Sequence, residues 1–192
     1  MSIFERRQLV LKDWVRRLDL DMAAQQNGWV LRKEVMATDE EPYQKQWATE
    51  DEQIAYVYVE DDRIDVRYIE VRAVAIDEAE RELREIVNTY TQDELVALAA
   101  MAQTPEQWRD ALHKAAVGAP KQYDANYFRI FLSGLQHPDR NVKIAAMEAA
   151  PYVHWREFEL PLMKMEKSDP VAGREAGIML QAMREHEWNQ QA

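Results

Sequence analysis

The sequence predicts an α+β fold, in which a small N-terminal unit of helix and β-hairpin leads into an all-α unit of helical hairpins. Two alternating runs rich in β-branched and aromatic residues lie between residues 54 and 72, a pattern typical of strands. From Thr91 onward the apolar residues follow helical spacing. We place the boundary between residues 1–90 and 91–192. Because no flexible linker separates the two units, we expect them to pack as one body.

The first segment, about Ile3 to Ala24, is interpreted as a helix. Its apolar residues recur at helical spacing, namely Leu11, Trp14, Val15 and Leu18. Asn27-Gly28 predicts the end of this helix. Trp29 to Met36 favours a strand. The polar stretch from Ala37 to Glu52 contains a proline and is interpreted as a loop.

A β-hairpin is predicted next. Its strands are Ile54–Val59 and Arg63–Arg72, joined by the acidic turn Glu60-Asp61-Asp62. After Tyr68 the alternation changes phase, which either a bulge or burial of both faces would explain. Asp77 to Tyr90 returns to helical spacing, with Leu83, Ile86 and Val87 expected to face inward. The N-terminal unit is therefore expected to hold about three strands.

The second half contains helix-start patterns. Thr91 with Glu94 and Thr104 with Gln107 each fit a capping box, and Pro105 suits the first helical position. Val117-Gly118 predicts the end of the helix that begins there. Four further helices are expected at about residues 123–136, 139–152, 155–167 and 170–187.

Two blocks in this half repeat at a distance of 31 residues. The shift superposes four pairs, namely Lys143 on Arg174, Ala145 on Ala176, Ala146 on Gly177 and Met147 on Ile178. A Pro-Asp or Asp-Pro turn precedes each block, and an apolar helix precedes each turn. Small residues let neighbouring helices approach closely, as stacked helical hairpins require.

This pattern resembles the HEAT-repeat superfamily, in particular its short bacterial type related to phycobilisome-lyase repeats. The matching features are the turn, the basic residue four or five positions later, and the Ala-Ala or Ala-Gly pair, over about residues 123–187. A looser third copy spans residues 104–117, and solenoids usually need three or more units. The resemblance implies a helical stack used for protein recognition and carries over no catalytic residue.

The composition excludes several kinds of site. Without cysteine there is no disulfide, Cys-ligated zinc or thiol nucleophile. The five glycines are scattered, and the three serines lie outside a nucleophile turn. No two histidines have the helical spacing of a zinc pair. We therefore expect no catalytic residue, metal or cofactor. For Glu185-His186-Glu187 we favour a solvated helix end over a divalent-ion site.

Charge and hydropathy bear on partners and compartment. A net charge of −11 argues against general binding to nucleic-acid phosphates. No apolar run approaches the ~20 residues of a membrane span or has the form of a secretory signal. We expect a soluble, cytoplasmic protein that does not interact with membranes.

The acidity is concentrated in one segment. Residues 39–80 hold 14 acids and four bases, a net of −10, whereas residues 1–33 have a net of +3. We expect the basic N-terminal segment to pair internally with the acidic one. The densest acids, Asp61, Asp62 and Asp65, are candidates for an acidic patch that binds a basic protein. The alternative is a solvated turn that protects a strand edge.

Aromatic residues give a second candidate. Of the six tryptophans, Trp14, Trp29 and Trp108 fit core stripes, whereas Trp47 and Trp155 are harder to place in a core. Tyr123, Tyr127, His154 and Trp155 are the candidate binding residues of the helical half, because exposed aromatics are common in interface hot spots. Ordinary core packing or turn formation is the alternative for each.

Three functional hypotheses follow. The first is a non-enzymatic binding or adaptor protein, in concrete form a bacterial immunity-type protein that covers a basic partner with its acidic surface. The second, implied by the resemblance, is a protein that handles a small molecule such as a bilin chromophore. The third is a plain oligomerisation module.

Overall fold

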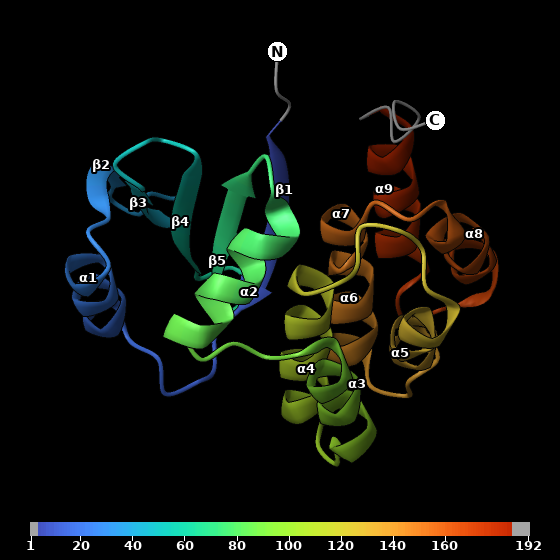
Figure 1. The fold of residues 1–192 in the computed structure, drawn as a ribbon. Coiled ribbons are helices and arrows are strands. Elements are labelled where there is room, and N and C mark those ends of the chain that lie inside the picture. Colours follow the sequence, from blue (N-terminus) through green and yellow to red (C-terminus); the bar gives the residue numbers. More distant parts are fainter. Residues whose placement is uncertain (1–3, 186–192) are drawn as a thin grey trace. The chain divides into compact units, whose positions relative to one another are not determined.

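The computed structural model describes residues 4–185 of the chain. It divides into two compact units, Met1–Thr91 and Gln92–Ala192 (Figure 1). Over residues 4–91 the first contains a five-stranded sheet with two helices, and over residues 92–185 the second is helical. The predicted α+β class is confirmed.

The N-terminal unit is built on one antiparallel sheet. Its strands follow the order β1-β5-β4-β3-β2. Their bounds are β1 Glu5–Val10, β2 Val30–Val35, β3 Tyr43–Ala48, β4 Ile54–Asp61 and β5 Val66–Ala73. Helices α1 (Arg17–Gln26) and α2 (Ile76–Ile86) complete the unit.

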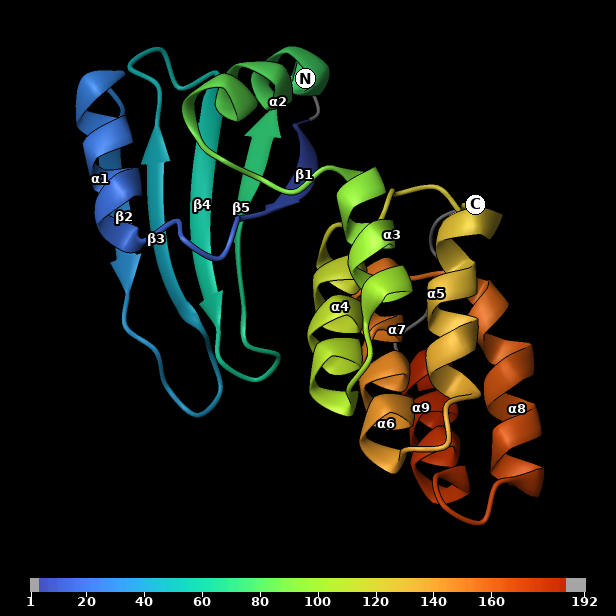
Figure 2. The ribbon, with the colours of Figure 1, turned by 90° about the horizontal axis from the view of Figure 1, so that it is seen from below.

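Both helices cover the same face of the sheet (Figure 2). Alternate strand residues such as Tyr56, Tyr58 and Ile69 pack in one cluster with Leu20 of α1 and Leu83 of α2. Trp29 stacks on Tyr56 with ring centroids 4.1 Å apart. Burial of these large side chains is the main stabilising contribution to the unit.

The predicted hairpin is confirmed as β4 and β5, which pair in continuous register from Ile54 with Ala73 to Asp61 with Val66. The change of phase after Tyr68 is explained by burial of both faces of β5. Tyr68 is buried on one face and Ile69 on the other. Asn27-Gly28 also ends α1 as expected, with Gly28 at a φ of 68°.

Two sequence predictions for the N-terminal unit are wrong. Residues 5–10 form the edge strand β1 rather than the start of a helix, because they pair with β5, from Glu5 with Ala73 to Val10 with Tyr68. Tyr43–Ala48 forms β3 rather than a loop. Its inward positions are Tyr43, Lys45 and Trp47, and the Lys45 ammonium pairs with Asp21 at 2.5 Å. The aliphatic part of the lysine side chain packs on the apolar face. Because a charged residue occupies an inward position, the alternation of apolar and polar residues that indicates a strand is not apparent in the sequence.

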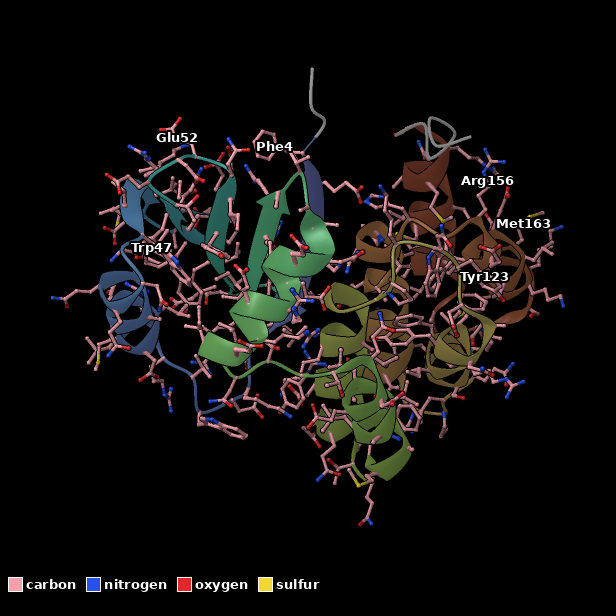
Figure 3. All side chains as sticks on the ribbon, in the orientation of Figure 1. Phe4, Trp47, Glu52, Tyr123, Arg156 and Met163 are labelled. Atoms are coloured by element: carbon pink, nitrogen blue, oxygen red, sulfur yellow. The ribbon has the colours of Figure 1, made fainter. Side chains whose placement is uncertain are left out.

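The tryptophan assignments also change. Trp47 and Trp155 are buried, whereas Trp14 is 63% exposed. Trp47 points from β3 toward α1 (Figure 3). Leu18, predicted to share a stripe with Trp14, is exposed, and so is Ile86, which was expected to face inward. α1 begins only at Arg17, so the helical spacing assumed for Leu11 to Leu18 does not exist.

Between residues 92 and 185 the helical unit contains three successive helical hairpins with short connecting pieces. Its elements are α3 Gln92–Met101, α4 Pro105–Val117, α5 Ala125–Leu135, α6 Arg140–Glu148, α7 Ala150–Val153, the 3-10 helix η1 Arg156–Phe158, α8 Glu159–Ser168 and α9 Gly173–Glu185. The capping box at Thr104 is confirmed. The Thr104 hydroxyl accepts a hydrogen bond from the Gln107 backbone N–H, and the Gln107 side chain reaches back to the Thr104 N–H.

The 31-residue repeat corresponds to equivalent turns before α6 and α9. The Asp139 carboxylate accepts hydrogen bonds from the Asn141 and Val142 N–H groups. Asp169 accepts in the same way from Val171 and Ala172. The Lys143 ammonium of α6 also pairs with Asp169. This ion pair links the first copy of the repeat to the turn of the second copy.

Two helical glycines differ in the space around them. A Cβ on Gly134 would lie 2.8 Å from the Ala146 Cβ and 2.9 Å from a Leu112 methyl carbon, because α5 passes closely over α4 and α6 there. A Cβ on Gly177 would meet the end of the flexible Glu166 side chain, at 3.0 Å.

We expect Gly134→Ala to lower the free energy of unfolding by about 1–3 kcal/mol, since overpacking exceeds the gain in helix propensity. Gly177→Ala is the matched control and should be neutral or stabilising by up to about 1 kcal/mol. Urea denaturation of both variants tests this. Equal stability changes would contradict the close packing of α5.

Candidate functional site

The three acids at the β4–β5 turn differ in their exposure to solvent. Asp61 is only 2% exposed. The Arg63 Nε and Nη2 atoms each donate to its carboxylate at 3.0 Å. Burial therefore removes Asp61 from the accessible acidic surface. Asp62 and Asp65 are exposed, while Ile64 between them is buried and anchors the turn. Asp65 has a φ of 53°, a conformation that Asp tolerates better than most residues.

The β2–β3 connection adds three exposed acids, namely Asp39, Glu40 and Glu41. Thr38 holds this loop as a turn, because its hydroxyl accepts hydrogen bonds from the Glu40 and Glu41 N–H groups at 3.3 and 3.0 Å. These acids were expected in a loop and were not among the predicted site residues. The signal available in the sequence was the run of three consecutive acids immediately before Pro42.

The two acidic turns lie at the same end of the sheet. β3 and β4 are antiparallel neighbours, and Tyr43 at the start of β3 pairs with Glu60 near the end of β4. The chain that enters β3 and the chain that leaves β4 therefore meet there. We call Asp39, Glu40, Glu41, Asp62 and Asp65 the acidic end. Within residues 4–185 none of these five carboxylates forms an ion pair.

Several other acids of the segment form ion pairs with bases of the N-terminal segment, as the sequence predicted for that basic segment. Arg17 pairs with Glu60 at 2.5 Å and Arg32 with Glu52 at 2.7 Å. Arg7 pairs with both Asp77 and Glu80. Burial raises the pKa of Glu60, but hydrogen bonds from Arg17 and Tyr58 outweigh it, so the net shift is downward. The five carboxylates of the acidic end have no such arginine partner among residues 4–185.

In the helical unit the structure brings together three of the four predicted aromatic-site residues. Tyr123 and Trp155 have ring centroids 5.4 Å apart, and Tyr127 and Trp155 6.3 Å apart. Phe128, Phe131 and Phe158 complete this aromatic cluster. Tyr127 is buried, and burial raises its pKa above the usual value. Its hydroxyl donates to the Ala115 carbonyl at 2.9 Å.

The cluster reaches solvent through Tyr123, which is 45% exposed and precedes α5 (Figure 3). Trp155 is buried, and its Nε1–H has no hydrogen-bond partner among residues 4–185. His154, the fourth predicted residue, ends α7 with a φ of 54° and has an exposed side chain. Partial burial nevertheless lowers the pKa of His154.

Among the described residues no group of three or more His, Asp or Glu side chains is placed to hold a metal ion. His186 and Glu187 lie outside these residues. A shallow pocket of about 250 Å³ lies in the N-terminal unit, lined by Trp14, Val15, Asp19, Ile86, Val87 and Asn88. None of the helices between residues 4 and 185 is long and apolar enough to cross a membrane.

Comparison with protein-family models, with curated proteins and with solved structures finds no match to this chain.

Proposed function

We propose that this chain is a non-enzymatic binding protein whose acidic end binds a basic surface of a partner protein. The observation that supports the proposal most is the position of the five carboxylates of the acidic end. They are exposed and unpaired within residues 4–185, whereas neighbouring acids of the same segment pair with arginines. Unpaired charge of one sign on a surface attracts an oppositely charged partner and sets its orientation.

In its concrete form the proposal describes an immunity-type protein that covers a basic toxin or another basic protein. The helical unit would act as a HEAT-like stack, an assignment supported by the equivalent Asp139 and Asp169 turns. We also propose a cytoplasmic location, with which the absence of cysteine is consistent.

Reversing two charges of the acidic end tests the proposal. In Glu40→Lys/Asp62→Lys, we expect the association rate constant for the partner recovered from the host to fall at least about tenfold. The physical reason is that the reversed side chains repel a basic surface. Surface plasmon resonance with purified partner, repeated at increasing salt, measures the effect, and the wild-type rate should fall with salt.

The matched control is Glu50→Lys/Glu78→Lys, which makes the same charge change at exposed sites away from the acidic end. This variant should keep the association rate within about twofold of wild type. The proposal is rejected if both variants bind alike, or if binding does not depend on salt.

A further inference from the structure

Trp155 contains a buried donor that the fold does not satisfy. Its side chain is 3% exposed, and the Nε1–H has no acceptor among residues 4–185. Every other buried side-chain nitrogen or oxygen in that part of the chain has a partner. An unsatisfied buried donor costs about 1–3 kcal/mol, and a neighbouring ring face offers at most a weak N–H···π contact. A phenylalanine would fill most of this space without the cost.

The rings around Trp155 differ in how firmly they are held. Tyr127 and Phe131 are fully buried in α5, and the Tyr127 hydroxyl is tied to the Ala115 carbonyl. Tyr123 lies in the irregular connection between α4 and α5 and is 45% exposed. Tyr127 and Phe131 are therefore fixed neighbours of the indole. Of the rings in contact with it, Tyr123 is the one that solvent reaches.

The backbone before Trp155 is held in an unusual conformation. His154 is left-handed, with φ 54° and ψ 30°, which costs a non-glycine residue of order 1–3 kcal/mol. This turn ends α7 and directs the next side chain into the aromatic cluster. The left-handed His154 therefore costs conformational free energy, and it positions the Trp155 indole, whose N–H has no acceptor among residues 4–185.

We propose that Trp155 is the hydrogen-bond donor of a binding site for an aromatic peptide segment. An aromatic side chain of the partner takes the place of the Tyr123 ring, and a backbone carbonyl of the same segment accepts from Nε1. This inference rests on the proposed protein-binding function and specifies a second contact, on the helical unit. A peptide supplies both groups, since each residue carries a carbonyl and aromatic anchors are common in hot spots.

Side-chain NMR on the full chain tests the inference. The indole N–H resonance of Trp155 is identified by its loss in Trp155→Phe. The probe is N-acetyl-L-phenylalanine methylamide, with toluene as the probe that lacks an acceptor. We expect the first probe to move this resonance downfield, as a new hydrogen bond requires, and toluene to leave it without a downfield shift. A resonance unmoved by the peptide probe overturns the proposal.

Two variants separate the role of the Trp155 hydrogen-bond donor from that of the Tyr123 ring, which the bound peptide displaces. Trp155→Phe should bind the peptide probe about fivefold more weakly, the loss of one neutral hydrogen bond. Tyr123→Ala should bind it more tightly, because the competing ring is gone. Trp108→Phe, the same substitution at a half-buried site on α4, should leave the affinity unchanged. Equal affinity of wild type and Trp155→Phe overturns the proposal.

A third probe, phenylacetate, distinguishes a small carboxylate from a peptide. If phenylacetate binds more tightly than the peptide probe, the peptide assignment is wrong. These probes carry no basic group, so their result is independent of the acidic end. If the peptide probe does not bind at Trp155 but partner binding shows the expected salt dependence, this inference is rejected and the proposed function still stands.

Discussion

Phe131→Ala will lower the free energy of unfolding by about 3–5 kcal/mol, the usual cost of removing a fully buried phenylalanine. Phe131 is 0% exposed and lies at the centre of the aromatic cluster, with ring centroids 5.4 Å from Phe158 and 6.2 Å from Trp155. Its removal leaves a cavity among rings that α5, η1 and their neighbours hold in place. Urea denaturation followed by tryptophan fluorescence measures the loss.

Leu160→Ala is the control for this experiment. Leu160 lies on α8 and is 68% exposed, so its truncation should change stability by no more than about 0.5 kcal/mol. If Phe131→Ala were as mild as Leu160→Ala, the aromatic cluster would not be a packed core.

Asp169→Ala should destabilise the protein by about 2–3 kcal/mol. The carboxylate caps two backbone N–H groups, at 2.8 and 3.0 Å, and pairs with Lys143. Both side chains are largely shielded, with 14% and 12% exposed. Losing the cap costs about 1 kcal/mol, and leaving the shielded Lys143 ammonium without a counter-charge adds to it.

Asp139→Ala is the matched control for Asp169. Asp139 caps its turn in the same way through the N–H groups of Asn141 and Val142. Its loss should cost only about 1 kcal/mol, the value of a cap alone. Equal losses at the two positions would show that the Lys143–Asp169 pair contributes nothing to stability.

The same ion pair predicts a pH dependence. Hydrogen bonds from the Lys143 ammonium and from the Val171 and Ala172 N–H groups lower the pKa of Asp169. Because the folded-state pKa is below the unfolded value of about 3.9, this stabilisation is present above that pH and is lost as the pH falls through the folded pKa. The stability difference between wild type and Asp169→Asn should therefore shrink on acidification from about pH 6 to about pH 3. A constant difference would contradict the lowered pKa.

Local patterns predicted the elements whose partners are close in sequence. The β4–β5 hairpin has its two strands joined by a short turn, and the Thr104 cap is made within four residues. Tyr123, Tyr127 and Trp155 were named only as separate candidates, and the packing of successive helical hairpins is what brings their rings together.

Strands β1 and β3 were missed because their pattern depends on distant partners. Glu5 pairs with Ala73, and Lys45 occupies an inward position that becomes compatible with the core only through Asp21 of α1. The sequence of either strand alone has too few apolar residues to be told from a helix start or a polar loop. Pairing with the distant strand β5 therefore decided β1, and the ion pair with α1 made the inward lysine of β3 compatible with the core.

By itself the sequence determined the α+β class, the internal repeat and the concentration of acids in residues 39–80. The tertiary structure decided which acids are available. It buries Asp61 against Arg63, pairs Glu60 with Arg17, and leaves the five carboxylates of the acidic end exposed. The reason is that charge is additive along a chain, whereas exposure and pairing depend on which distant side chains the fold brings within a few ångströms.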